Sequence, residues 1–391
     1  MSCLRKPETP GDLLTDLEVA AGFPLGREAG AEGLPAPTVT SRQAAEANLL
    51  KGLLRPPLFV SFSGGRDSSA VLALAVHVAR REGLPLPVPL TLDFPGAQRA
   101  AEEEWQRSVL DAVGITQGER LVLGTEMNLL GPTARAVLGR LGLKSPPNLY
   151  LHAPLLELAR GGSLATGIGG DEMLGSGDIG PTALVVARRK SPSRHDLRVL
   201  AFQLLARPLA RRVWERRRER SPWLLPRSDS QQLHRQSQLW QPEWKGWAPL
   251  VEVYAGSRDY WVRVRAFAAL AASYDVQPLH PFFDRSFMTA LSHEGGRLGP
   301  GDRTAAMTSL VGDLLPAPVL SRQSKAEFGE IVSAGEAATF RRGAALGSVR
   351  NPHVDLDRLR EQWLELSPPF GTGLLLQKAW LDAGQPPLEA A

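Results

Sequence analysis

A turn rich in glycine and serine stands between an apolar run and a helix-forming run near residue 60. Leu58–Phe62 is short and apolar and follows two prolines, which predicts a buried strand. The turn Ser63–Ser69 has the sequence Ser-Gly-Gly-Arg-Asp-Ser-Ser. Ala70–Arg81 is rich in Ala, Leu and Val at helical spacing, so a helix is expected to follow the turn. The chain is therefore expected to place a helix start beside a strand end.

This arrangement suits phosphate binding. A helix start presents unpaired N–H groups and a partial positive charge, and glycines let the backbone approach an anion. Asp67 carries the wrong charge for an anion site unless a divalent cation joins it, and a carboxylate can hold Mg²⁺ against phosphate oxygens. The residue order matches neither Walker A nor the dinucleotide fingerprint, and the alternative is a purely structural turn. The predicted phosphate-binding residues are Ser63, Gly64, Gly65, Asp67, Ser68 and Ser69.

Strand-like and helix-like runs alternate over the next part of the chain. Further strands are expected at 88–92, 120–123 and 163–166, and helices at 99–113, 127–141 and 148–160. Short connections between alternating elements predict right-handed crossovers and an α/β fold. We expect a parallel sheet of about five strands with helices on both faces, followed by a mainly helical C-terminal half. Ligands of such sheets bind at the carboxyl ends of the strands.

A second glycine-rich motif, Thr166–Gly175, directly follows the last of these predicted strands. Gly169 and Gly170 permit close backbone approach, and Asp171 supplies a second carboxylate. Aspartates at neighbouring strand ends can share one Mg²⁺ on a phosphate chain, so Asp67 and Asp171 are the predicted metal ligands. The alternative is a glycine-rich turn with solvated acidic residues.

Composition excludes several classes of site. The 391 residues include one cysteine, Cys3, and seven histidines, which rules out a disulfide framework and a Cys-rich zinc site. No run is apolar for long enough to span a membrane, and the N-terminus has no signal-like core, so we expect a cytoplasmic protein. The net charge of +4 is modest for a dedicated nucleic-acid binder.

Three parts are expected along the chain: an N-terminal extension at 1–45, an α/β core at 46–185 and a mainly helical part at 186–391. In the last part, Arg207–Arg220 is either a solvated charged helix face or an anion- or peptide-recognition patch. A proline-constrained segment around Gln277 leads to Asp284, a plausible helix N-cap. Arg322 and Lys325 are either a surface pair or a pair that stabilises developing negative charge.

These motifs, in this order, resemble the pyrophosphate loop of the N-type ATP pyrophosphatases and the synthetase domain of the asparagine synthetase family. That family includes β-lactam synthetase, carbapenam synthetase and the macrolactam synthetases of lasso peptides. The matching segments are Ser63–Ser69, Gly167–Glu172, Pro281–Asp284, and Leu315–Pro316 with Arg322 and Lys325. The resemblance runs from about residue 45 to near the C-terminus.

The resemblance implies an adenine nucleotide α-hydrolase-like fold and an ATP- and Mg²⁺-dependent ligase. A substrate carboxylate would attack the α-phosphorus of ATP, and an amine would then displace AMP to form an amide. Lys325, with Arg322, would stabilise charge in both steps, and the strand end near Leu92 would face the adenine. The substrate would be a peptide or a small amino-acid-derived acid, with a leader-peptide or processing partner left open.

Departures from the family pattern argue against asparagine as the product. Cys3 is not at the second position and few residues precede the loop, so no glutaminase domain is expected. Gln277 replaces a glutamate of the asparagine synthetases, and a lysine and an arginine before Leu-Pro appear as Gly301 and Thr308, although Arg303 can substitute. The Arg-x-x-Lys spacing and the segment Leu374–Leu381 look most like the lasso-peptide branch. The alternatives are an RNA-modifying pyrophosphate-loop enzyme, although nucleic acid is not the expected partner, and a non-catalytic nucleotide-binding protein.

Overall fold

The computed structural model describes most of the chain. The described residues are 13–94, 103–124, 126–175, 185, 191–206, 209, 212–213, 221–239, 247–296, 299–322, 329–343, 345–365 and 367–385. Lys325 and most of Arg207–Arg220 lie outside these residues.

A five-stranded parallel sheet carries the site, which confirms the predicted fold class. Its strand order is β3–β2–β1–β4–β5. The central strand β1 lies between β2 and β4, with Phe59 opposite both Val88 and Leu164. The strands are β1 (Leu58–Ser61), β2 (Val88–Asp93), β3 (Glu119–Val122), β4 (Ser163–Ala165) and β5 (Gln277–Leu279).

The fifth strand comes from the half of the chain expected to be mainly helical. Gln277 pairs with Ser163, and Leu279 with Ala165, in parallel register. The sequence did not predict this strand, because it is three residues long and contains Pro278. Proline cannot donate to a sheet ladder and is tolerated at an edge, which is where β5 lies.

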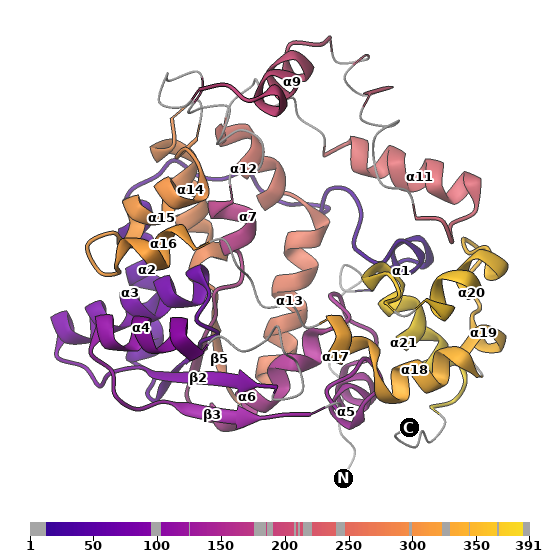
Figure 1. Cartoon of the computed structure of the whole chain (residues 1–391), viewed down its shortest axis with the longest axis horizontal. Helices are drawn as coiled ribbons and strands as arrows, with labels where there is room; N and C mark the ends of the chain where they lie inside the picture. Colours follow the sequence, from indigo (N-terminus) through magenta and orange to yellow (C-terminus); the bar gives the residue numbers. More distant parts are fainter. Residues whose placement is uncertain are drawn as a thin grey trace.

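Helices cover both faces of the sheet, and alternate strand residues face opposite cores. Leu58 and Val60 pack in one core with α2 (Ser41–Leu53) and α3 (Arg66–Glu82), whereas Leu90 and Leu164 pack in the other with α6 (Ala153–Leu158) and α13 (Arg258–Ala272). Figure 1 shows α3 and α4 (Glu103–Val113) above β2 and β3, and α6 and α13 toward the centre of the molecule. Burial on both faces is typical of parallel sheets.

The helices of the first half are α1 (Asp16–Ala21), α2 (Ser41–Leu53), α3 (Arg66–Glu82), α4 (Glu103–Val113), α5 (Pro132–Leu141), the 3₁₀ helix η2 (Leu149–His152), α6 (Ala153–Leu158) and α7 (Gly170–Leu174). The expected helix at 127–141 begins only at Pro132, after a loop. Asn128, in that loop, uses its side chain to accept from the N–H of Leu130 at 3.0 Å, which favours a turn over a helix.

Helices account for most of the described second half. They are α9 (Arg194–Gln203), α11 (Pro226–Ser237), α12 (Trp247–Ala255), α13 (Arg258–Ala272), η4 (Pro281–Phe283), α14 (Arg285–Glu294), α15 (Arg303–Val311), α16 (Ala317–Ser321), α17 (Gly329–Ser333), α18 (Gly335–Arg342), α19 (Ala345–Ser348), α20 (Leu356–Leu364), η5 (Phe370–Thr372) and α21 (Gly373–Asp382). Asp284 caps α14 as predicted, accepting from Ser286 N at 2.9 Å. Among the helices described, none is long and apolar enough to cross a membrane.

The N-terminal segment packs against the C-terminal helices. Figure 1 shows α1 beside α20 and α21, and the indole N–H of Trp223 donates to Ala20 O at 2.7 Å. Glu18 of α1 is fully buried and accepts hydrogen bonds from Arg258 Nε at 2.5 Å, Leu25 N at 3.0 Å and Thr15 N at 2.8 Å. These contacts fix α1 against the start of α13.

Candidate active site

The first glycine-rich loop connects β1 to α3 at the carboxyl end of the sheet. Gly64 has φ of +83°, a left-handed conformation that reverses the chain, and Gly65 is the extended N-cap of α3. The helix begins at Arg66, not at Ala70 as predicted, so Asp67 lies in its first turn. Among the described residues, no side chain caps this N-terminus. Its backbone N–H groups therefore suit an anion.

The serines of the loop serve partly to fix its shape. Ser68 Oγ donates to Gly65 O at 3.1 Å and accepts from Ser63 N at 3.2 Å. Ser63 is exposed, whereas Ser69 is fully buried and its Oγ has no hydrogen-bond partner among the described residues. Of the three predicted phosphate-binding hydroxyls, Ser63 is thus the one open to solvent, and Ser68 stabilises the turn.

The second motif packs directly against the first. A Cβ on Gly170 would lie 2.2 Å from Asp67 Cγ, and one on Gly167 would lie 2.9 Å from Ser68 N. Gly169 has φ of +96° and is the N-cap of the short helix α7, which carries Asp171 in its first turn. Glycine at 167 and 170 therefore brings the two motifs into backbone contact, as expected for neighbouring strand ends.

Arg303, the first residue of α15, joins the two predicted metal ligands. Its Nη2 donates to Asp67 Oδ2 at 2.5 Å and its Nη1 to Asp171 Oδ1 at 2.5 Å. Burial would lower the pKa of Arg303, but Asp67 and Asp171 outweigh it and raise that pKa, so the guanidinium stays charged. The two carboxylates thus converge on one positive charge.

A second guanidinium lies beside this cluster. Burial and the neighbouring charge of Arg303 lower the pKa of Arg66, while Asp67, Asp171 and Asp302 oppose that effect. The sequence suggested Arg303 only as a substitute for the lysine and arginine that the family has before Leu-Pro. It did not indicate a role for Arg66, because this residue occupies the variable position of the loop motif.

The residues at this site fit Mg²⁺ held together with ATP. No group of three or more His, Cys, Asp or Glu in the part of the chain that the structure describes could hold a metal. Mg²⁺ on a nucleotide needs only one or two carboxylates, because phosphate oxygens and water complete its shell. Asp67 and Asp171 both pair with the guanidinium of Arg303, and the backbone N–H groups at the start of α3 lie next to them.

Arg322 contacts the first loop. The residue is 6% exposed, and its Nη1 donates to Gly64 O at 2.8 Å. Its guanidinium also lies over the ring of Trp105, with 5.0 Å to the centroid. This geometry makes Arg322 a support for the loop, and its predicted partner Lys325 lies outside the described residues.

Two other predicted positions lie at strands of the same sheet. Leu92 is partly buried near the end of β2, beside β1. Gln277 begins β5, at the opposite end of that strand from the loops, opposite Ser163.

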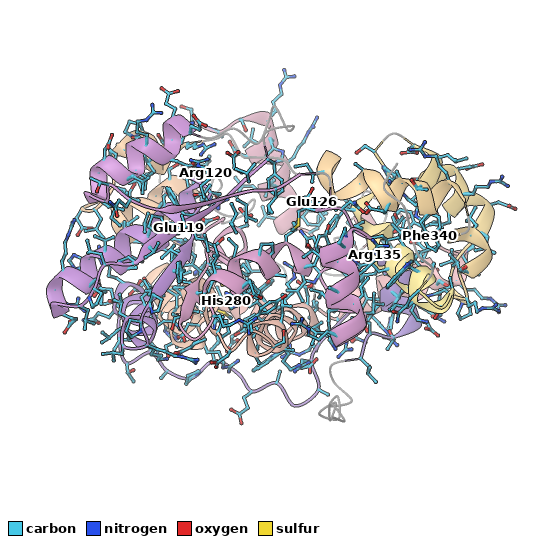
Figure 2. All side chains as sticks on the ribbon, turned by 90° about the horizontal axis from the view of Figure 1, so that it is seen from below. Glu119, Arg120, Glu126, Arg135, His280 and Phe340 are labelled. Atoms are coloured by element: carbon cyan, nitrogen blue, oxygen red, sulfur yellow. The ribbon has the colours of Figure 1, made fainter. Side chains whose placement is uncertain are left out.

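The second motif is held by a partly buried histidine, His280. Thr166 Oγ1 and His280 Nδ1 are 2.7 Å apart, and Thr166 Oγ1 also accepts from Ile168 N at 3.3 Å. Burial, aided by His152, lowers the pKa of His280 to about 3, and burial lowers that of His152 to about 4. Figure 2 shows His280 among closely packed side chains. Both rings are therefore neutral.

Glu172 links this site to α13, a connection that the sequence analysis missed. Arg263 Nη1 donates to Glu172 Oε1 at 3.1 Å, and its Nε donates to Asp259 at 3.0 Å. Burial raises the pKa of Glu172 and of Asp259, with Arg263 opposing the shift in each case. Spacing in the sequence could not reveal this contact, because it joins residues in the two halves of the chain.

One comparison with known proteins identifies a family. The model of the family described as Asparagine synthase matches residues 55–346, about three quarters of the chain. A search of the curated proteins finds no match. Two solved structures are similar in part. The U34-tRNA thiolase NcsA from Methanococcus maripaludis is 13% identical, with 73% of this chain and 90% of that chain covered and a TM-score of 0.23. The NAD⁺ synthetase from Burkholderia pseudomallei is 17% identical, with coverages of 68% and 97% and a TM-score of 0.23. At these scores neither structure bears on function.

Proposed function

This chain belongs to the asparagine synthase family of ATP-dependent carbon–nitrogen ligases, and we propose that it adenylates a substrate carboxylate before forming an amide. A carboxylate oxygen attacks the α-phosphorus of ATP, and the bond to pyrophosphate breaks. An amine nitrogen then attacks the acyl carbon, AMP leaves, and the amine loses a proton.

One observation carries this proposal: Asp67 and Asp171 converge on a single cation beside the start of α3. That arrangement offers carboxylates for a metal and N–H groups for phosphate in one place. Mg²⁺, when bound, would neutralise phosphate oxygens and make pyrophosphate a better leaving group.

The chain's own residues have distinct roles in this proposal. Asp67 and Asp171 hold the metal, and the amides at the start of α3 bind phosphate. Arg303 offsets part of the negative charge of the two carboxylates in the protein alone and supplies a positive charge near the phosphates in the complex. Arg322 holds the loop through Gly64 O, and the family pattern assigns to Lys325 the stabilisation of charge in adenylation and in amide formation.

The product we propose is a lactam or another amide of a peptide or an amino-acid-derived acid, made in the cytoplasm. Support comes from Gln277, Gly301 and Thr308, which depart from the asparagine synthetase pattern, and from the Arg322-x-x-Lys325 spacing shared with the lasso-peptide branch. A partner that presents a leader peptide fits the same proposal.

The test is ATP–pyrophosphate exchange with Mg²⁺ and pooled candidate acids and peptides. We expect substrate-dependent exchange that is lost in Asp67→Asn and Asp171→Asn and kept in Asp357→Asn, a matched change at an exposed position of α20. Exchange that survives in both site variants would show that the two aspartates do not hold the metal. ATP cleavage to ADP and phosphate would exclude adenylation.

A further inference from the structure

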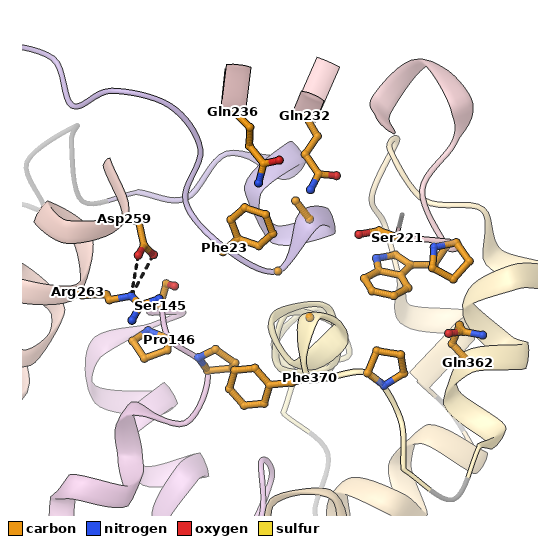
Figure 3. A pocket seen from close by; sticks show the side chains of 17 residues that line it. Phe23, Ser145, Pro146, Ser221, Gln232, Gln236, Asp259, Arg263, Gln362 and Phe370 are labelled. Carbon is orange, nitrogen blue, oxygen red and sulfur yellow. Dashed lines mark hydrogen bonds and ion pairs between the residues drawn. The ribbon is translucent and has the colours of Figure 1, made fainter. Parts of the chain in front are cut away.

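A cavity of about 750 Å³ lies between the N-terminal segment, α11, α13 and the C-terminal helices. Figure 3 shows Gln232 and Gln236 reaching into it from α11, with Phe23 beneath them and Phe370 across from them. Its volume is within the range of small-ligand pockets, roughly 300–1,000 Å³. None of the roles proposed above uses it.

One wall of the cavity connects it to the candidate active site. Asp259 and Arg263 line it, and their ion pair is drawn in Figure 3. Arg263 also binds Glu172, which is the neighbour in sequence of Asp171. A ligand in the cavity would therefore contact a residue, Arg263, that is paired with the sequence neighbour of a proposed Mg²⁺ ligand.

The lining of the cavity includes an amide with an unsatisfied oxygen. Gln232 is 3% exposed, and its Oε1 accepts no hydrogen bond from any described residue. A buried acceptor without a partner costs free energy, which a ligand N–H donor would recover. Gln236 and Gln362 add two more amides to the lining, and each amide can both donate and accept.

The charge and shape of the lining narrow the ligand class. Among the described residues that line the cavity, charge is confined to Asp259 and Arg263, which neutralise each other. A phosphate or a free carboxylate therefore meets no unpaired cation. Aromatic rings and prolines supply flat apolar surface, and Phe370 is 51% exposed.

We propose that this cavity binds an uncharged segment of a peptide, whose backbone amides pair with the glutamines and whose apolar side chains pack on the rings. The inference rests on the proposed function in one respect: the bound peptide is the substrate whose carboxylate or amine reacts at the ATP site. A cavity of this volume is much larger than a single small amino acid needs, which favours a peptide over such an acid.

The experiment is affinity selection from three pools of pentapeptides with acetylated N-termini and amidated C-termini: neutral, acidic and basic. Capped peptides have no carboxylate or amine at their ends, and binding is measured without ATP. We expect binders in the neutral pool, followed by calorimetry on the best of them. Gln232→Leu and Phe370→Ala should each weaken that binding by about tenfold, the loss of one hydrogen bond or ring contact.

Gln231→Leu is the matched control, because Gln231 precedes Gln232 on α11 but is exposed and outside the lining. Its affinity should equal that of the unmodified protein. Phe370→Ala removes a half-exposed ring and keeps the test valid where Gln232→Leu fails to fold, as thermal melting would show. The inference is overturned by a neutral pool without binders, by preferred binding of a charged pool, or by equal losses in Gln231→Leu and Gln232→Leu. Failure of pyrophosphate exchange with peptide binding intact would instead count against the proposed function alone.

Discussion

Arg303 donates hydrogen bonds to Asp67 and to Asp171, at 2.5 Å each, and so connects the carboxylates of the two glycine-rich motifs. A guanidinium in this place substitutes electrostatically for the divalent cation that the same carboxylates are proposed to hold. Arg303 should therefore stabilise the protein without ligands, and Mg²⁺ should compensate in part when Arg303 is removed.

Replacing Arg303 should destabilise the protein, and Mg²⁺ should restore part of the loss. Arg303→Met leaves two carboxylates facing each other, and we expect a loss of about 1–2 kcal/mol in EDTA, between the values for exposed and buried ion pairs. Millimolar Mg²⁺ should recover stability by mass action. Urea unfolding in EDTA and in Mg²⁺ measures both. Arg358→Met, which breaks an exposed pair with Asp355, is the control and should show no such response.

Gly170→Ala should disable the site without unfolding the sheet. Its Cβ would lie 2.2 Å from Asp67 Cγ, so the carboxylate must move. A displacement of that size can lower activity by about 100-fold. Pyrophosphate exchange would measure the loss. Gly139→Ala is the control: its Cβ meets nothing within 4 Å on exposed α5, and the change should stabilise the helix by about 0.5–1 kcal/mol. Full activity in Gly170→Ala would contradict the packing of the two motifs.

Arg322 should act on nucleotide binding through the loop. Arg322→Ala leaves Gly64 O without this donor in a buried site, which costs about 1–3 kcal/mol of stability. Steady-state kinetics should show a raised KM for ATP with a smaller change in kcat, and Arg322→Lys should recover part of the KM. A loss confined to kcat would mean instead that Arg322 touches the reacting groups.

The two neutral histidines should make the protein sensitive to mild acid. Burial lowers the pKa of His280 to about 3 and of His152 to about 4, whereas the unfolded chain takes up a proton below about pH 6.5. Their contribution is complete above that pH and is lost as the pH falls toward the folded values. Between pH 7 and pH 5.5 each histidine should cost about 1 kcal/mol. Urea unfolding measures this loss, and His280→Asn should lose about 1 kcal/mol less than the unmodified protein over the same pH interval.

Glu18 and Arg258 should show strong coupling. Glu18→Leu leaves Arg258 without its closest acidic contact, at an expected cost of about 3–5 kcal/mol, while the double change with Arg258→Leu should cost less than the sum. Chemical denaturation of the unmodified protein, the two single variants and the double variant measures the coupling energy of the pair. The exposed pair of Glu157 and Arg160 provides the comparison, because solvent screening should make its coupling much weaker. Equal coupling in the two cycles would mean that Glu18 does not anchor the N-terminal segment.

The sequence predicted the parts of this fold that follow local rules. Alternating apolar runs predicted β1 to β4, and the cap at Asp284 followed from residue type. The start of α3 was misplaced, because Asp and Ser favour turns in the sequence but here occupy the first turn of a helix. The strand β5 was missed, because its pairing with β4 depends on distant residues and not on its own pattern.

The sequence predicted the centre of the candidate site but not the contacts around it. Two glycine-rich motifs at strand ends implied that Asp67 and Asp171 would lie close together, and the packing of Gly170 on Asp67 agrees with that expectation. The cluster formed by Glu172, Arg263 and the lining of the cavity had no counterpart in the sequence analysis. Such contacts arise from the packing of α13 and α11, which single-sequence patterns do not determine.

Because β5 lies far along the chain from β4, the sheet cannot be completed until late in protein synthesis. When residues up to 185 have emerged from the ribosome, the segments that form β1 to β4 are complete. At that point β4 still lacks the neighbouring strand that Gln277–Leu279 provides. The nascent chain therefore exposes an unpaired strand edge during the synthesis of all the intervening residues, a state that favours association with other chains. Premature termination in that interval would leave a fragment with an open sheet, so we expect chaperones to bind the polypeptide until β5 emerges.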